Sequence, residues 1–297
     1  MQVGAPVPLT GRYAAQGAWM RAGLVAWARD SGARLELVDD GSSPDQAVRV
    51  AGELAERCPL VLGPYGSDCV RAVARAGAAP VVWNHGGAAD DVQRLPGVVS
   101  LPSPASRYLV ALGRAVALER PGARVHVAVA PGAFARLARE GLEREAGALG
   151  LSLVDEPDTA DAVLLCGPIE WEAGELRRLR PSGQALIGAV SAGLVPGSDP
   201  DAWPGATLAP VQWHPDLPSA PELGPARPNV ENYVAAQAYA AAVLATHCRT
   251  LDAARGLRTT TFFGGFALAP DGLQVGHRLA VVRRRGRRTE VVLAGAA

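Results

Sequence analysis

Two turns built from small and polar residues carry the side chains of this chain that are best suited to binding chemistry. The first turn reads Gly-Pro-Tyr-Gly-Ser-Asp at residues 63–68, and the second reads Trp-Asn-His-Gly-Gly at residues 83–87. Glycine lets a ligand approach backbone N–H groups closely, and the Ser67 hydroxyl can both donate and accept hydrogen bonds. A helical pattern begins at Ser67, so the helix dipole favours a negatively charged ligand group there. Two ordinary strand–helix turns would have the same local sequence, and both interpretations stay open at this point.

Histidine and cysteine side chains are the next candidates for chemistry. His85 lies in the second turn, where a neutral imidazole could hydrogen-bond a ligand, and a purely structural role is the alternative. The five histidines form no i,i+4 pair, and the four cysteines show no Cys-x-x-Cys spacing. We therefore expect no metal site, no cofactor and four free, buried thiols.

The glycine-rich segments of the chain match no catalytic or phosphate-binding motif. Residues 188–193 have one residue too many for the nucleophile elbow of a serine hydrolase. The glycines at 63–66 lack the lysine of a phosphate-binding loop and the third glycine of a dinucleotide-binding fingerprint. These departures predict that the protein is not an enzyme.

Composition limits the partners of the chain. With 29 basic and 29 acidic residues the formal net charge is zero, so we expect neither nucleic-acid binding nor attraction to a membrane surface. The arginine-rich segment 283–288 is expected to form a solvated hairpin tip. No apolar run approaches the roughly 18–20 residues of a membrane-spanning helix. Met1 leads directly into a strand-like segment, which predicts either a leader missing from this chain or a cytosolic protein.

Short apolar segments precede both turns and predict buried strands, so strands and helices alternate around them. The expected strands lie at 3–9, 34–38, 60–62, 80–83 and 98–101, with helices at 16–29, from 44 onwards, and at 67–76. The start of the second of these helices, where Ser43 precedes Pro44 and Gln46 follows three residues after the serine, predicts an N-cap and a capping box. The alternation predicts a doubly wound parallel sheet, in which ligands bind at the carboxyl ends of the strands.

A second alternating unit follows. The expected helices lie at 105–118, 134–148 and 170–180, and the expected strands at 124–129, 151–154, 161–165 and 184–189. Residues 192–228 are rich in proline and glycine, with a strand at 207–211, and a helix is expected at 230–249. The tail predicts antiparallel strands at 262–268, 279–284 and 289–293. The fold class is therefore α/β, with two lobes.

Several motifs occur in one order along the chain: Pro-Leu-Thr-Gly at 8–11, Asp-Asp at 39–40, Ser-Pro-Asp-Gln-Ala at 43–47, Gly-Pro-Tyr-Gly-Ser at 63–67, Pro-Ser at 102–103, Phe-Gly-Gly-Phe at 263–266 and Asp-Gly-Leu-Gln-Val-Gly at 271–276. This order resembles the type I periplasmic binding proteins of the branched-chain amino acid class. The resemblance implies two Rossmann-like lobes, each with a central parallel sheet, joined by three crossovers, and a ligand enclosed in the cleft by hinge closure. Lobe one would hold 1–104 and 217–261 and lobe two 105–210 and 262–297, with crossovers near 102–105, 210–217 and 261–264.

The resemblance also implies a set of ligand-binding residues: Tyr13, Tyr65, Gly66, Ser67, His85, Gly86 and Gly87 in lobe one, and Phe134, Glu170, Ser191 and Trp213 in lobe two. The turns at 66–67 and 85–87 would hold the ligand's carboxylate and amino group. Relatives that bind amino acids carry Ala or Ser followed by Thr where this chain has two glycines. An acidic residue that meets the ammonium group would align near Val190, and Glu170 is expected to replace it.

The function implied is that of an extracytoplasmic solute-binding protein of an ABC importer. It would bind a small amino-acid-like, amide or carboxylate ligand and deliver it to a transporter permease. The alternative is a cytosolic ligand sensor of the same fold, which regulates a partner protein or transcription.

Overall fold

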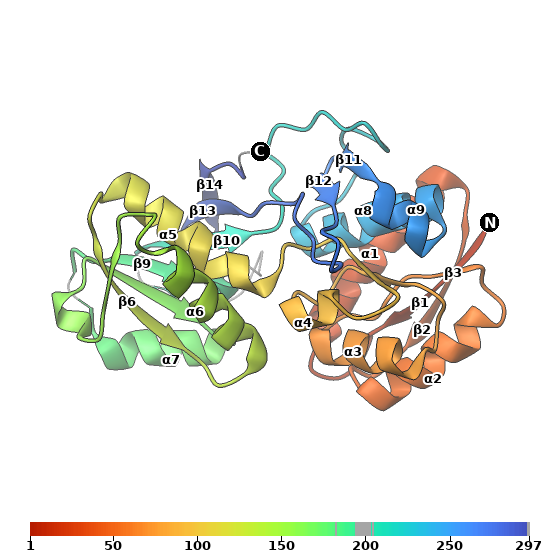
Figure 1. Ribbon diagram of the computed structural model, residues 1–297, viewed down its shortest axis with the longest axis horizontal. Coiled ribbons are helices and arrows are strands. Elements are labelled where there is room, and N and C mark those ends of the chain that lie inside the picture. The colour runs from red at the N-terminus through yellow and green to blue at the C-terminus, as the bar shows by residue number, and fades with distance from the viewer. Residues whose placement is uncertain (182, 194–202, 204, 296–297) are drawn as a thin grey trace. The chain divides into compact units, whose positions relative to one another are not determined.

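Two compact α/β units make up the protein. The computed structural model describes residues 1–181, 183–193, 203 and 205–295. The first unit consists of Met1–Pro104 and Leu217–Arg278, and the second consists of Ala105–Asp216 and the chain from Leu279 to residue 295. Figure 1 labels most of the elements of both units.

A parallel sheet forms the centre of the first unit. Its strands are β1 (Gln2–Val7), β2 (Arg34–Asp39), β3 (Leu60–Val61), β4 (Val82–Asn84) and β5 (Val98–Ser100), and a separate pair is β11 (Arg258–Thr261) and β12 (Gly264–Ala267). Its helices are α1 (Ala14–Ser31), α2 (Pro44–Ala55), α3 (Ser67–Ala76), α4 (Asp90–Gln93), α8 (Tyr233–Cys248) and α9 (Leu251–Gly256). Strands β2, β1 and β3 form one parallel sheet and β4 pairs with β5. A parallel bridge between Leu62 and Trp83 connects the two sets, so the carboxyl ends of β1, β3 and β4 lie at one edge.

Helices cover this sheet in two pairs. Helix α1 packs on α8, and α2 packs on α3. Figure 1 shows the strands β1 to β3 between these pairs. Large apolar side chains, among them Met20, Leu24, Leu54 and Leu62, are almost fully buried in this unit. The sheet edge with the two turns therefore stands on a packed core.

The start of α2 confirms the predicted N-cap and corrects one detail. The side chain of Ser43 accepts a hydrogen bond from the backbone N–H of Gln46, and Pro44 is the first helical residue. The reciprocal bond of a capping box does not form, because the Gln46 side chain accepts from Arg49 and the Ser43 N–H donates to the Asp40 carbonyl. Only half of the predicted capping box is present.

Residues 262–278 belong to the first unit, whereas the family resemblance implied that they lie in the second lobe. The Phe262 ring packs edge-on against Tyr239 of α8, with ring centroids 5.5 Å apart. Gln274 accepts from the backbone N–H of Ala267 and donates to the Leu101 carbonyl. These contacts hold the segment on the first unit, so the chain crosses to the second unit after Arg278 and not near 261–264.

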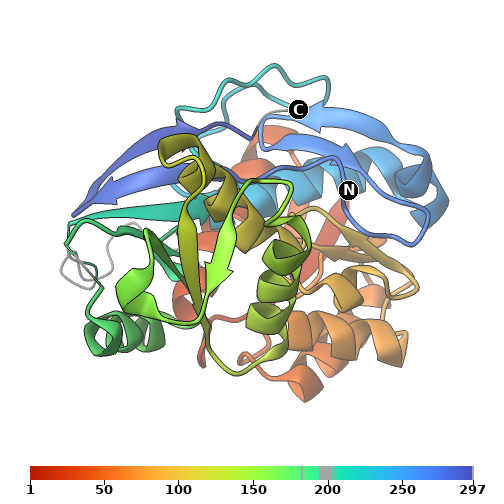
Figure 2. The ribbon, with the colours of Figure 1, turned by 60° about the vertical axis from the view of Figure 1, so that its left-hand side comes forward.

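A seven-stranded sheet forms the centre of the second unit. Its strands are β6 (Arg124–Val129), β7 (Ser152–Val154), β8 (Ala162–Cys166), β9 (Leu186–Ala189), β10 (Ala206–Val211), β13 (Ala280–Arg285) and β14 (Arg288–Leu293). Its helices are α5 (Tyr108–Glu119), α6 (Ala133–Glu145) and α7 (Ile169–Leu179), with short 3-10 turns at Ala105–Arg107, Pro157–Thr159 and Ser191–Gly193. The strand order is β14-β13-β10-β9-β8-β6-β7, parallel from β10 to β7 and antiparallel at β13 and β14. Figure 2 shows β13 and β14 beside β10.

The hairpin of β13 and β14 corrects the predicted arginine-rich tip in one respect. Arg284 is 5% exposed, and its guanidinium donates to the carbonyls of Ala192 and Gly286. Burial lowers the pKa of Arg284. Its neighbours Arg285, Arg287 and Arg288 are exposed, as expected of a solvated tip.

Three further features concern the described residues as a whole. All four cysteines are free and buried, as predicted. Across residues 1–181, 183–193, 203 and 205–295, no helix combines the length and hydrophobicity that crossing a bilayer requires. In the same ranges, no group of three His, Cys, Asp or Glu side chains is arranged to hold a metal ion.

Candidate functional site

Asn84 shapes the second turn, a role that the sequence did not reveal. The side chain is fully buried, and its Oδ1 accepts from the backbone N–H groups of Gly86 and Gly87 at 3.2 and 2.7 Å. Its Nδ2 donates to the Gly87 carbonyl and to the Ser100 hydroxyl at 2.7 and 2.8 Å. The two N–H groups expected to face a ligand therefore already donate to Asn84. The sequence feature that could have indicated this role is an asparagine at the end of a strand, directly before a short turn that contains two glycines.

Gly86 lies directly beside Tyr65 of the first turn. The two residues form a parallel bridge, and the N–H of Gly66 donates to the Gly86 carbonyl at 3.2 Å. A Cβ atom at position 86 would lie 2.6 Å from Tyr65 Cδ2 and 2.8 Å from Tyr65 Cα. The close approach of Tyr65 gives a physical reason for glycine at this position.

Gly86→Ser tests that close approach. We expect the variant to lower the free energy of unfolding by about 1–3 kcal/mol, because the added atoms overlap the Tyr65 ring and backbone. Chemical denaturation measures the change. Gly52→Ser is the matched control, since a Cβ atom at position 52 meets nothing within 4 Å. If the two substitutions change the free energy of unfolding equally, Tyr65 moves aside without destabilising the protein and the close approach does not require glycine.

The first turn brings two tyrosines together. The Tyr13 and Tyr65 rings meet edge to face, with centroids 5.4 Å apart. Gly66 has a φ of 95°, and a Cβ atom there would lie 2.8 Å from the Tyr13 ring, so glycine is required for both reasons. The Arg12 guanidinium lies 4.7 Å from the centre of the Tyr13 ring and pairs with Asp68. Burial and the Asp68 charge raise the pKa of Tyr13, so its hydroxyl keeps its proton.

Helix α3 begins at Ser67, as the sequence predicts. Within the described part of the chain, no side chain caps its N-terminus, where the preceding residue is Gly66. The Ser67 hydroxyl accepts from the backbone N–H of Ala89 at 3.1 Å. A Cβ atom at Gly87 would lie 3.2 Å from Ser67 Cα, so the second turn directly adjoins this helix start. Both predicted turns therefore meet at the N-terminus of α3.

His85 lies in the second turn but its ring is turned into the protein. The residue is 1% exposed, and neither ring nitrogen has a hydrogen bond of normal geometry among the described residues. Burial lowers the pKa of His85 to about 4, and the nearby backbone of Gly63 opposes this shift only in part. The imidazole is therefore neutral near pH 7, as expected, while its burial favours the structural alternative.

Asp40, at the end of β2, is a buried carboxyl group that the sequence did not single out for chemistry. Its Oδ1 accepts from the Ser42 N–H at 2.9 Å, and its Oδ2 has no partner among the residues that the structure describes. Burial, and to a lesser degree the charges of Asp39 and Asp68, raise the pKa of Asp40 to about 6. Asp39, in contrast, accepts from Thr10 and its neighbours, and these bonds lower its pKa.

In the second unit, Phe134 stands in the first turn of α6. Its ring meets the Tyr108 ring edge to face at 5.1 Å, and the Tyr108 hydroxyl accepts from the Gln212 side chain at 2.6 Å. Burial raises the pKa of Tyr108 to about 12. Phe134 itself is half-buried, and so is Trp213 just beyond β10.

Ser191 is placed differently from the predicted ligand contact, because Glu172 occupies its polar groups. Ser191 is 1% exposed, its hydroxyl hydrogen-bonds Glu172 Oε2, and its N–H donates to the same carboxyl group at 3.1 Å. Glu172 also accepts from the Gly167 N–H at 3.0 Å. This carboxyl group thus ties the end of β8 to the end of β9. Burial raises its pKa to about 8.

Glu170, which the sequence favoured, is exposed in the first turn of α7. Glu172 was missed because its helical position, two residues further on, gives no sign of the strand ends that it contacts. Glu170 therefore stays a predicted ligand contact, and Glu172 of the same helix turn has a structural role.

Comparison with known proteins gives one family match. The family described as periplasmic binding protein matches residues 1–163, which is more than half of the chain. A search of curated proteins found no match.

Three solved structures illustrate the similarity in fold. The leucine-binding protein LivK of Thermotoga maritima is 16% identical with a TM-score of 0.73, and the alignment covers 98% of this chain and 97% of that one. An ABC transporter substrate-binding protein of Desulfitobacterium hafniense in complex with Leu is 14% identical with a TM-score of 0.76, covering 98% and 99%. A solute-binding protein of an ABC transporter of Rhodopseudomonas palustris in complex with 3,4-dihydroxybenzoic acid is 15% identical with a TM-score of 0.74, covering 99% and 98%.

Proposed function

This chain belongs to the periplasmic binding protein family, and we propose that it is the solute-binding protein of an ABC importer that takes a small carboxylate-bearing ligand. The ligand class includes amino acids and their amides. The observation that carries the proposal is the start of α3, which has no side-chain cap among the described residues and presents Ser67 as its first residue. Backbone N–H groups and the helix dipole at such a terminus attract an anionic group.

Three features of the first unit support this assignment. Because the Ser67 oxygen accepts from Ala89, the hydroxyl hydrogen is left to donate to a ligand carboxylate. Arg12 pairs with Asp68 and so offsets the one negative charge in the first turn of α3. The Tyr13–Tyr65 pair supplies apolar surface next to Gly66. The leucine and 3,4-dihydroxybenzoic acid of the related structures share a carboxylate, which agrees with a site built around an anion.

The proposal also covers the ligand contacts of the second unit and the cellular compartment in which the protein acts. We assign Phe134, Glu170 and Trp213 as the ligand contacts of the second unit, and closure of the units on the ligand as the conformational step. The protein would act outside the cytoplasm, and its partner would be the permease of the transporter. A cytosolic ligand sensor of the same fold is the second candidate, and the four free, buried cysteines favour it because extracytoplasmic proteins commonly oxidise theirs. Detection of the native protein in the extracytoplasmic or the cytosolic fraction separates the two.

A thermal-shift screen tests the ligand class. Amino acids, their amides and small aromatic carboxylates are added to the full chain, and a ligand at 100 times its Kd should add about 2.7 kcal/mol to the free energy of unfolding. Primary amines without a carboxylate serve as the control set. If only such amines raise Tm, the carboxylate assignment is wrong.

Ser67→Ala tests the site with the best ligand from that screen. We expect binding to weaken by about 1–3 kcal/mol, because the variant removes a donor to the charged ligand group. Calorimetry measures the change in affinity. The variant also leaves the Ala89 N–H without its acceptor, so its unfolding is measured alongside. Ser31→Ala, at the exposed end of α1, is the matched control. Equal affinity of the two variants would remove Ser67 from the site.

A further inference from the structure

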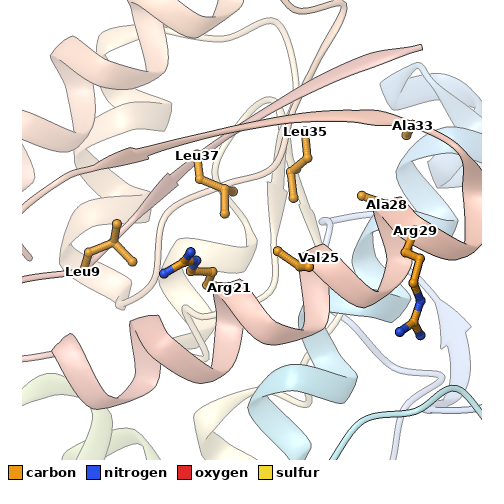
Figure 3. A pocket seen from close by; sticks show the side chains of 8 residues that line it. All are labelled: Leu9, Arg21, Val25, Ala28, Arg29, Ala33, Leu35 and Leu37. Atoms are coloured by element: carbon orange, nitrogen blue, oxygen red, sulfur yellow. The ribbon is translucent and has the colours of Figure 1, made fainter.

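An apolar groove of about 630 Å³ lies on the first unit between α1 and β2. Leu35 and Leu37 of β2 form one side, and Val25 of α1 and Leu9 beyond β1 complete it (Figure 3). Leu9 is 38% exposed and Val25 is 49% exposed, which makes them two of the most exposed large apolar residues described. The groove shares none of these residues with the two turns at the start of α3.

Strand β2 forms the open edge of its sheet. It pairs with β1 along its whole length, and no described strand pairs with its other side. Its side chains alternate, so that Glu36 bonds Gln2 and Arg57 while Leu35 and Leu37 line the groove. Edge strands are usually protected by proline, by bulges or by charged side chains on the exposed face. On the groove side β2 carries none of these over residues 34–38, so its backbone is suited to pairing with an added strand.

Arg21 gives the groove a charge. Figure 3 shows its guanidinium directed into the space between Leu9 and Leu37, whereas the Arg29 guanidinium turns away. Arg29 pairs with Asp30 at 3.2 Å, but Arg21 makes no ion pair with any residue that the structure describes. The lining residues include two arginines and no acid. Two copies of the chain joined groove to groove would place like charges together, so we expect the occupant to bring a negative charge.

We propose that β2 binds an extended segment of a partner protein that adds to the sheet as a further strand. Its apolar side chains, at every second position, would pack on Leu35, Leu37 and Val25, and a carboxylate on the same face would pair with Arg21. Main-chain hydrogen bonds to β2 supply affinity in this mode, and the groove and Arg21 supply the specificity. A small amphipathic acid fits the same chemistry less well, because an open groove buries only one side of it while an added strand also satisfies the β2 backbone.

The probe is the capped, fluorescein-labelled heptapeptide Glu-Thr-Val-Thr-Val-Thr-Glu, which places valine and glutamate on one face in either strand direction. Its counterpart carries lysine in place of both glutamates. Fluorescence anisotropy with the full chain should show preference for the glutamate peptide. Arg21→Glu should weaken that peptide about tenfold and favour the lysine peptide instead. Arg75→Glu, an equal charge change on exposed α3, should leave both affinities unchanged.

Hydrogen exchange with the bound peptide tests the strand addition itself. Amides of residues 34–38 should exchange more slowly in the complex, while amides of α3 keep their rates. Equal effects of Arg21→Glu and Arg75→Glu would overturn the proposal. So would unchanged exchange in β2 together with complete displacement of the peptide by octanoate, which would identify a site for small amphipathic acids. Both readouts are independent of the ligand site at α3, so failure here leaves the proposed function standing.

Discussion

Asn84→Ala is expected to lower the free energy of unfolding by about 3 kcal/mol and to abolish ligand binding at the start of α3. The substitution removes four hydrogen bonds at once, and it leaves the part-buried Gly86 N–H, the buried Gly87 N–H and the Gly87 carbonyl without these partners. Each buried polar group left unpaired costs about 1–3 kcal/mol. The second turn adjoins Ser67, so its collapse should reach the ligand site. Urea denaturation and calorimetry with the screened ligand measure the two effects.

Two control variants separate the parts of this effect. Ser100→Ala removes only one of the four bonds and should cost about 1 kcal/mol without loss of binding. Asn84→Asp keeps the acceptor for the Gly86 and Gly87 N–H groups but loses both donated bonds, so its stability should fall between the other two. If Asn84→Ala unfolds no more easily than Ser100→Ala, the turn does not depend on Asn84.

The sequence was sufficient to predict elements whose signals are local. Ser43 before Pro44 correctly predicted the start of α2, and the apolar runs correctly placed β6, β8 and the hairpin of β13 and β14 within a residue or two. The α/β class follows from that alternation. The short helices α4 and α9 and the strand β11 were missed, because six residues or fewer give too little periodicity to detect.

Residues 262–278 show that local sequence patterns do not determine which of the two units a segment joins. Their sequence predicted a strand at 262–268 and the resemblance implied that it enters the second lobe, but the Tyr239 ring and the Gln274 side chain hold the segment on the first unit. Such contacts join residues more than 20 positions apart along the chain. Local sequence patterns do not reveal contacts between such distant residues. The third crossing, which the resemblance implied near 261–264, therefore came too early.

The candidate site also combines features that the sequence could predict with features that it could not. Ser67 at the start of a helix and glycines beside Tyr65 could be predicted, because helix starts and tight turns have short-range signatures. The partners that organise the turns could not. Asn84 bonds Ser100 across 16 positions, and Glu172 bonds Ser191 across 19. Ser191 was predicted to contact the ligand on the family resemblance alone, whereas its hydroxyl and backbone N–H bond the Glu172 carboxyl group.

Glu172 should make stability fall as pH rises. Burial raises its pKa in the folded protein to about 8, against an ordinary value of 4.5. Between these pH values the folded protein holds a proton that the unfolded chain has released, so the unfolded state binds fewer protons. The free energy of unfolding then falls by up to about 1.4 kcal/mol per pH unit, in total by roughly 3 to 5 kcal/mol. Glu172→Gln resembles the protonated acid, and denaturation between pH 4.5 and 8.5 should show a flatter profile for it.

Asp40 supplies the control for this pH dependence, because its ionisation also lowers the free energy of unfolding as pH rises, but in a lower pH range. Burial raises its pKa to about 6 from 3.8, so Asp40→Asn should flatten the profile only below about pH 6. Subtracting the Glu172→Gln profile from that of the unchanged chain cancels the Asp40 contribution and leaves that of Glu172. Parallel profiles between pH 6 and 8 would mean that the hydrogen bonds donated by Gly167 and Ser191 keep the Glu172 carboxylate ionised despite its burial. In that case Glu172→Gln would destabilise the protein equally at every pH, since the ends of β8 and β9 would lose a charged acceptor.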